Sequence, residues 1–406
     1  MSAPSKRALA LVALAAAVLL YEGLQPGFGP PSPWWDAPVA LLLAGGIAAV
    51  AGRHIASTLA AVALFLAPPL AAPDVVLPQD ADSAPGDRDR VLITVDTWRA
   101  DYAFDLPGWR VYDEAVAPSN WTLPSMDSLM RGQPVRRHRG GLPSDGGFTR
   151  PLEATPVLAE GIEGRSAAFV CNPYLSTEFG FDRGFDTFVH ADSWRERFSL
   201  FHFLRQWRKR TFGGIERQRA ERDAYLVDEA IRWWESTPKG RFLWVHLLGP
   251  HEYTRTEQTA ESYAAQVDAV EVHVRRLLEA IDEDARVVLT SDHGESLGED
   301  GRWGHGRSFE SEEVHVPLAL RGPDPGEYPR QASLTDVVHF LDQGDTEALD
   351  RGREVIELGG HHRQVAWALR RTGGQLQDRK GPAPAPGQAL SPEVEANLRE
   401  LGYLQP

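Results

Sequence analysis

The 406-residue chain is poor in cysteine and in lysine. Its one cysteine, Cys171, excludes an internal disulfide, so cysteine usage does not identify the compartment. Lysine occurs four times against 38 arginines, and the formal net charge is -15. A general nucleic-acid binder needs a basic face, so this acidity argues against nucleic acid as a partner. Hydrophobic residues still make up 42% of the chain, which is enough for a sizeable core.

The chain also lacks an apolar run as long as the roughly 20 residues of a typical membrane-spanning helix. Its first 75 residues instead contain three shorter apolar runs, at 8–21, 37–51 and 55–72. Trp34 and Trp35 precede the second run, and such aromatic pairs favour a membrane interface. The first run also resembles the core of a cleaved signal peptide, but a signal peptide would not explain the other two. We therefore predict about three transmembrane helices in residues 1–75.

Basic residues predict the orientation of this membrane region. Lys6 and Arg7 precede the first run, and Arg53 lies between the second and third. Basic residues that flank a membrane span stay on the cytoplasmic side. An odd number of crossings therefore places the residues after the third run on the extracytoplasmic side. We expect a multi-pass protein of the cell membrane with an extracytoplasmic catalytic domain. The predicted parts are a membrane region at 1–75, a linker at 76–90, a catalytic domain at 91–325 and a C-terminal extension at 326–406 that packs on it.

Short β-branched apolar runs predict buried strands in the catalytic domain. The runs lie at 91–95, 241–248, 286–291 and 316–320, and helical stretches lie at 220–235 and 263–281. Apolar residues recur at helical spacing within the second of these stretches. The alternation of strands and helices predicts a doubly wound α/β domain.

Three of these strands are followed by residues that suit a divalent cation. Asp96 follows the first strand, His251 the second, and Asp292 with His293 the third. The carboxyl ends of parallel strands meet where open α/β sheets bind ligands, and Asp and His ligate divalent ions. We expect Gly294 to supply the turn that lets Asp292 and His293 reach one ion. The alternative for Asp96 is a helix N-cap.

Six segments carry a specific family resemblance. They are VLITVDTWRAD (91–101), APSNWTLPSMDSLMRG (117–132), NPYLSTEFGFDRGFDTF (172–188), VHLLGPHEYT (245–254), TSDHGESLGEDGRWGHG (290–306) and LRELGYL (398–404). In this order they resemble motifs of the sulfatase family in the alkaline phosphatase superfamily. The resemblance covers most of residues 91–325 and implies an alkaline-phosphatase-like doubly wound mixed sheet with helices on both faces.

The resemblance also implies site residues. Those that would hold one divalent ion (Mn, Mg, Ca or Zn), with a second ion left open, are Asp96, Thr122, Asp292 and His293. Those that would bind the substrate are Thr97, Asn172, His251 and His305. Thr122 is in addition the implied nucleophile, and His251 and His305 are implied catalytic residues.

Two departures from the sulfatase pattern bear on the substrate. Sulfatases convert a Cys or Ser nucleophile to formylglycine and fix it with an Arg four positions on, whereas this chain has Thr122 and Met126. They also have a second Asp after the first, where this chain has Thr97. Both changes favour phosphate-ester chemistry, as in phosphodiesterases or phosphoglycerol and phosphoethanolamine transferases. We predict a metal-dependent hydrolase or transferase with a covalent phospho-threonine intermediate.

Two other functions stay open at this point. One is a sulfatase-type sulfate ester hydrolase, and the other is a catalytically inactive, membrane-tethered binding module. Thr122 itself could be a plain helix N-cap before Pro124. The expected partner is an anionic ester, either a lipid or a cell-surface glycan. The basic and aromatic stretch 195–222 could lie on anionic headgroups or receive such a substrate, and a solvated helix with buried aromatic side chains is the other interpretation.

Overall fold

A computed structural model describes most of the chain from residue 88 to residue 359. The described residues are 75–76, 88–138, 140, 143–144, 147–148, 156–191, 215–255, 258–353, 355–359, 364–369 and 377–380. The three apolar N-terminal runs, most of the linker, most of the basic stretch and the motif at 398–404 lie outside them. None of the helices within the described ranges is long and apolar enough to cross a membrane.

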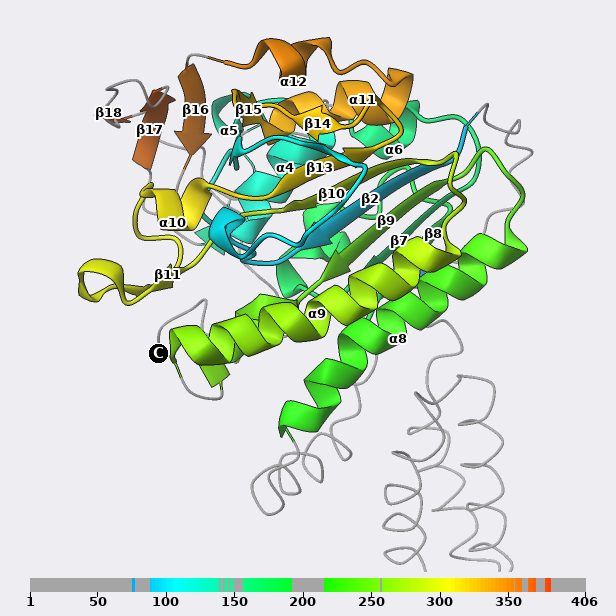
Figure 1. The fold of residues 1–406 in the computed structure, drawn as a ribbon, viewed down its shortest axis with the longest axis horizontal. Helices are drawn as coiled ribbons and strands as arrows, with labels where there is room; N and C mark the ends of the chain where they lie inside the picture. Colours follow the sequence, from blue (N-terminus) through cyan, green and yellow to red (C-terminus); the bar gives the residue numbers. More distant parts are fainter. Residues whose placement is uncertain are drawn as a thin grey trace, which may run out of the picture. The chain divides into compact units, whose positions relative to one another are not determined.

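A mixed nine-stranded sheet forms the centre of the fold (Figure 1). Its strands, in spatial order, are β1 (Val75–Val76), β8 (Thr187–His190), β7 (Ser166–Val170), β9 (Phe242–Leu247), β2 (Arg90–Val95), β10 (Arg286–Ser291), β13 (Leu318–Arg321), β3 (Arg110–Val111) and β14 (Gly326–Glu327). The five strands from β8 to β10 run parallel, and β13 is antiparallel to β10. The predicted mixed sheet is therefore observed.

Helices cover both faces of this sheet because side chains alternate along its strands. From β2, Val91 and Ile93 point into a cluster with residues of α8 (Ile215–Ser236) and α9 (Ala260–Ala280). Leu92 points the other way, into a cluster with α4 (Thr122–Arg131) and α11 (Val337–Gln343). The two predicted helices at 220–235 and 263–281 correspond to α8 and α9, which begin three to five residues earlier.

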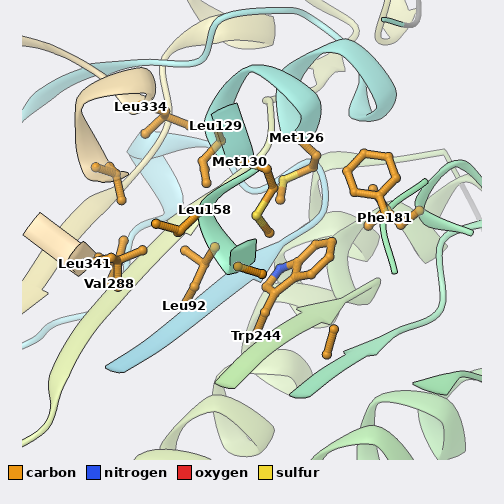
Figure 2. Close-up of a cluster of buried hydrophobic side chains, with 14 of the residues drawn as sticks. Leu92, Met126, Leu129, Met130, Leu158, Phe181, Trp244, Val288, Leu334 and Leu341 are labelled. Carbon is orange, nitrogen blue, oxygen red and sulfur yellow. The ribbon is translucent and has the colours of Figure 1, made fainter. Parts of the chain in front are cut away.

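The cluster beneath α4 contains one of the residues that depart from the sulfatase pattern. Figure 2 shows Met126 of α4 above the sheet, near Trp244 and Phe181. Met126 is fully buried in this apolar cluster. Its side chain therefore packs in the core, where an arginine would be an unpaired buried charge.

Short elements complete the described chain. They are η2 (Ala100–Tyr102), β4 (Glu114–Val116), α5 (Val135–His138), β5 (Pro143–Ser144), β6 (Gly147–Phe148), α6 (Leu158–Gly161), η3 (Pro173–Leu175), η4 (Thr177–Phe179), η5 (Gly249–Arg255), β11 (Ser296–Leu297), η6 (Glu299–Gly301), β12 (Trp303–Gly304), α10 (Ser311–Val314), β15 (Gln331–Ser333), η7 (Leu334–Asp336), α12 (Glu347–Arg351), β16 (Val355–Gly359), β17 (Gln364–Leu369) and β18 (Gln377–Lys380). In the described part of the predicted extension, β14 joins the main sheet, β15 pairs with β4, and α11 packs on α4 and β10.

Candidate metal centre and active site

The register of the parallel strands brings two carboxylates together at one edge of the sheet. Val95 of β2 pairs with Ser291 of β10, so Asp96 and Asp292 leave neighbouring strands at the same level. Asp96, Asp292 and His293 are fully buried, and one ligand atom from each lies within 4.8 Å of the others. His293 Nε2 is 3.8 Å from Asp96 Oδ1 and 3.4 Å from Asp292 Oδ2.

Thr122 lies at the first position of α4 and faces this cluster. Its hydroxyl is 3.3 Å from His293 Nε2 and accepts a hydrogen bond from Asn172 Nδ2 at 3.2 Å. The residue in the N-cap position of α4 is Trp121, so the N-cap interpretation of Thr122 is wrong. Ser125 of the same helix donates to the backbone carbonyl of Asp292, which ties α4 to the turn after β10.

Two carboxylate oxygens at the centre have unmet hydrogen-bonding capacity. Asp96 Oδ2 accepts from Asn172 Nδ2 at 2.6 Å, and Asp292 Oδ1 accepts from the backbone N–H of His293 at 2.9 Å. Asp96 Oδ1 and Asp292 Oδ2 are buried and have no hydrogen-bond partner among the described residues. An ionised oxygen buried without a partner is costly. Two such oxygens beside His293 Nε2 and a threonine hydroxyl are a suitable donor set for a divalent cation.

The charges of the two aspartates affect each other. Burial alone would raise the pKa of Asp96, but the hydrogen bond with His246 and the charges of nearby histidines outweigh it and hold the pKa well below its usual value. Burial and the Asp96 carboxylate raise the pKa of Asp292. Without a cation, the second negative charge in this pair is therefore disfavoured.

Thr97 follows Asp96 in a strained conformation. Its φ is 56°, in the left-handed region that β-branched residues avoid, and it is the one non-glycine residue with positive φ in the described chain. Its hydroxyl is buried without a hydrogen-bond partner among the described residues. Tyr263 donates to the Thr97 carbonyl at 2.7 Å. Strain of this kind concentrates at functional sites, and the substrate-binding role of Thr97 stays a prediction.

Gly294 is required here for a reason that differs from the predicted one. Its φ is not in the left-handed region, so turn geometry does not demand glycine. A Cβ at Gly294 would instead lie 2.1 Å from the carbonyl oxygen of Glu312. The turn after β10 thus packs directly against the backbone of α10, and the backbone N–H of Gly294 donates to the Glu313 carbonyl at 2.9 Å.

His251 and His305 lie beside the metal centre with opposite electrostatic surroundings. The His305 ring centroid is 4.4 Å from that of His293 and 5.4 Å from that of His251. Burial lowers the pKa of His251 to about 4. Burial would also lower the pKa of His305, but the Glu295 carboxylate 2.8 Å from Nδ1 outweighs it and raises the pKa to about 9. At neutral pH the pair offers one neutral and one charged imidazole.

Three buried residues at the site were not identified from the sequence. His246 contacts Asp96 Oδ2 at 3.3 Å, and Glu295 binds His305. Glu313 accepts from the side chain of Asn120 and from the backbone N–H of Ser308, both at 3.1 Å, and so joins the segment before Thr122 to the loop after His305. Glu295 directly follows the Asp292-His293-Gly294 motif, which is a usable signal, whereas nothing in the sequence marks Glu313.

Comparisons with known proteins identify the family of this chain. Residues 111–343, more than half of the chain, match the family model for sulfatases. Over an alignment of 121 residues, which covers 27% of this chain and 21% of that protein, the chain is 31% identical to iduronate 2-sulfatase of Homo sapiens. Over an alignment of 142 residues, which covers 29% of this chain and 34% of that protein, the chain is 28% identical to the low-salt glycan biosynthesis sulfotransferase Agl7 of Haloferax volcanii. The aligned segments thus span only about a fifth and a third of these relatives.

Solved structures share the fold. Ps i-CgsB in complex with k-i-k-neocarrahexaose has a TM-score of 0.51 at 14% identity, over 78% of this chain and 97% of that chain. BT1596, a 2-O GAG sulfatase, has a TM-score of 0.50 at 13% identity, over 77% and 90%. At such low identity these likenesses concern the fold alone. With the family match over more than half its length, the chain belongs to the sulfatase family of the alkaline phosphatase superfamily, a family of metal-dependent enzymes.

Proposed function

We propose that this protein transfers a phosphoryl group from an anionic ester to Thr122, and then to water or to an acceptor alcohol. The observation that carries the proposal is that two buried carboxylate oxygens without a hydrogen-bond partner lie beside His293, whose Nε2 is 3.3 Å from the Thr122 hydroxyl. A threonine hydroxyl is a weak nucleophile until a neighbouring group activates it. Here that hydroxyl lies 3.3 Å from His293 Nε2, one of the candidate ligand atoms.

The residues that would hold a divalent cation (Mn, Mg, Ca or Zn) are Asp96, Thr122, Asp292 and His293. When bound, the cation lowers the pKa of the hydroxyl and neutralises a phosphoryl oxygen. Thr122 and Leu123 begin α4, and N–H groups in the first turn of a helix favour anions. Asn172, within 3.2 Å of the Thr122 hydroxyl, and the strained Thr97 are suited to contact the substrate.

The two histidines suit the two proton transfers. In the first step, the Thr122 hydroxyl loses its proton to solvent, Thr122 Oγ1 forms a bond to phosphorus, and the bond from phosphorus to the leaving oxygen breaks. The leaving oxygen keeps the electron pair and takes a proton from the charged His305. In the second step, neutral His251 accepts the proton of the incoming water or alcohol, whose oxygen forms a bond to phosphorus. The phospho-threonine bond breaks, and its electron pair returns to Thr122 Oγ1. Pairs whose pKa values are driven apart in this way suit acid and base roles.

A second candidate is transfer or hydrolysis of a sulfate ester. It is favoured by the aligned segments of iduronate 2-sulfatase and of the sulfotransferase Agl7. It is opposed by Thr122, which cannot become formylglycine, and by Met126, which is buried in the core. An inactive binding module is a weaker candidate, because every predicted ligand lies at the centre.

The membrane attachment belongs to the same proposal. Residues 1–75 would anchor the protein in the cell membrane, with the catalytic domain on the extracytoplasmic side. The motivating observation is the set of three apolar runs with Lys6 and Arg7 before the first. The substrate would then be an anionic ester at the cell surface, either a lipid or a glycan.

One assay separates these functions. The purified chain is incubated with a generic phosphodiester, a phosphomonoester and a sulfate ester, each with added Mn²⁺ and with a chelator. We expect metal-dependent turnover of a phosphate ester. Turnover of the sulfate ester alone would favour the second candidate, and a wild-type chain that binds metal but turns over none of them would favour the binding module.

A further inference from the structure

A chain of buried hydrogen bonds leads from the core to Asp96. Trp244 Nε1 donates to Thr94 Oγ1 at 3.1 Å, and Thr94 Oγ1 lies 2.8 Å from His246 Nδ1. His246 Nε2 lies 3.3 Å from Asp96 Oδ2. Thr94, Trp244 and His246 are fully buried, and Thr94 and His246 are register partners on β2 and β9. All three therefore lie on the strands that lead to the metal centre.

The chemistry of these groups fixes which way the last hydrogen bond runs. If Thr94 donates to Nδ1, the neutral ring carries its hydrogen on Nε2. If Nδ1 instead donates to Thr94, the neutral ring directs the lone pair of a bare Nε2 at the Asp96 carboxylate, which is unfavourable. The contacts therefore favour the first arrangement, which places the N–H on Nε2. His246 therefore donates to Asp96 Oδ2.

The two oxygens of Asp96 are consequently in different situations. Oδ2 accepts from Asn172 Nδ2 at 2.6 Å and from His246 Nε2. Oδ1 has no hydrogen-bond partner among the described residues and lies 3.8 Å from His293 Nε2. The group of atoms within 4.8 Å of one another contains Asp96, Asp292 and His293 but not His246. His246 thus contacts the ligand rather than joining the ligand set.

We propose that His246 is a positioning residue, which holds Asp96 so that Oδ2 is occupied and Oδ1 is presented to the cation. The proposal rests on the proposed function, because it assumes that Asp96 binds metal. Thr94 and Trp244 in turn fix the imidazole plane. Partners that orient a ligand in this way commonly change metal affinity by about 10–100-fold when they are removed.

The test is the dissociation constant for Mn²⁺ of the purified full-length chain, measured by electron paramagnetic resonance of the free ion. His246→Gln can place an amide N–H near the position of Nε2 and should keep the constant within about threefold of wild type. His246→Leu removes the donor and should raise it about 10–100-fold. Thr94→Val keeps the imidazole but removes the hydroxyl that holds it in position, and should raise the dissociation constant for Mn²⁺ by about tenfold or less.

Thr290→Val is the matched control. Thr290 is buried at the same register on β10, where its hydroxyl donates to the Pro317 carbonyl rather than toward Asp96. The Thr290→Val substitution should leave the dissociation constant for Mn²⁺ unchanged. The melting temperature of the metal-free chain, measured for each variant, separates an effect on the ligand from general damage to the core.

Three results would overturn the proposal. In the first, His246→Leu binds Mn²⁺ as wild type does. In the second, His246→Gln loses as much affinity as His246→Leu. In the third, Thr290→Val weakens binding as much as Thr94→Val. A wild-type chain that binds no Mn²⁺ is a distinct outcome, because it rejects the metal centre itself together with the role of His246.

Discussion

Two buried aspartates, Asp292 and Asp127, should respond in opposite ways to the same substitution. Asp292 carries an unpartnered oxygen beside Asp96, and burial with that neighbour raises its pKa. Asp127 of α4 is paired with Arg131 at 2.6 Å and with His138 at 2.5 Å. Burial would raise the pKa of Asp127, but His138 and Arg131 outweigh it and lower the pKa.

These directions give the sign of each effect near pH 7. A carboxyl group whose pKa is raised on folding lowers the stability once the pH exceeds its pKa in the unfolded chain. Removing the charge of Asp292 should therefore stabilise the metal-free protein. A carboxyl group whose pKa is lowered adds stability above its unfolded value and loses it as the pH falls. Removing the charge of Asp127 should therefore harm the metal-free protein.

The magnitudes follow from the contacts. In Asp292→Asn the amide keeps the acceptor oxygen and replaces the unpartnered one, which should recover about 1–3 kcal/mol of metal-free stability. For a domain of this size this corresponds to a rise in melting temperature of roughly 2–12 °C. Asp127→Asn breaks a buried ion pair and should cost about 3–5 kcal/mol.

The assay is thermal unfolding with a chelator and with a series of Mn²⁺ concentrations. Wild type should gain about 2.7 kcal/mol at a concentration 100 times the dissociation constant, whereas Asp292→Asn should gain almost nothing. The reasoning is refuted if Asp292→Asn has a lower melting temperature than wild type in chelator. The carboxylate oxygen of Asp292 that lacks a hydrogen-bond partner would then not destabilise the metal-free protein.

Three further predictions concern other parts of the account. Glu295→Gln removes the charge that raises the pKa of His305 and should lower that pKa by about 1–3, so the alkaline limb of the kcat/KM profile should move to lower pH; an unmoved limb argues against His305 as the acid. Gly294→Ala puts a methyl group against the Glu312 carbonyl and should destabilise the fold by about 1–3 kcal/mol or more, measured by denaturant unfolding, whereas wild-type stability would contradict the close approach. A reporter fused after residue 90 should be active outside the cell, and a cytoplasmic signal would reject the outside orientation.

Much of the sheet and of its functional edge could be predicted from the sequence. The runs at 91–95 and 286–291 are apolar and β-branched, and they correspond to the parallel neighbours β2 and β10. Because parallel neighbours end at the same edge, the residues that follow them meet. The short edge strands β3 and β14 could not be predicted, since two residues carry no periodicity.

The supporting residues were harder to identify because their meaning depends on tertiary register. His246 lies inside the apolar run FLWVHL of β9, where it resembles an ordinary buried residue. Its partner Asp96 is 150 residues away in sequence, and only the pairing of β2 with β9 brings them together. The sequence indicates Gly294 as a turn residue, but its role depends on the backbone of α10, which no local pattern indicates.

The most direct test of the account is the fate of Thr122 during turnover of a phosphodiester. Rates are compared for wild type, Thr122→Ala and Thr122→Ser, and rapidly quenched enzyme is analysed by mass spectrometry at a resolution that separates phosphate from sulfate. We predict phosphorylated Thr122 in wild type, measurable activity in the Ser variant, and a loss of several orders of magnitude in a folded Ala variant. An Ala variant that is as active as wild type would contradict the proposal that Thr122 is the nucleophile.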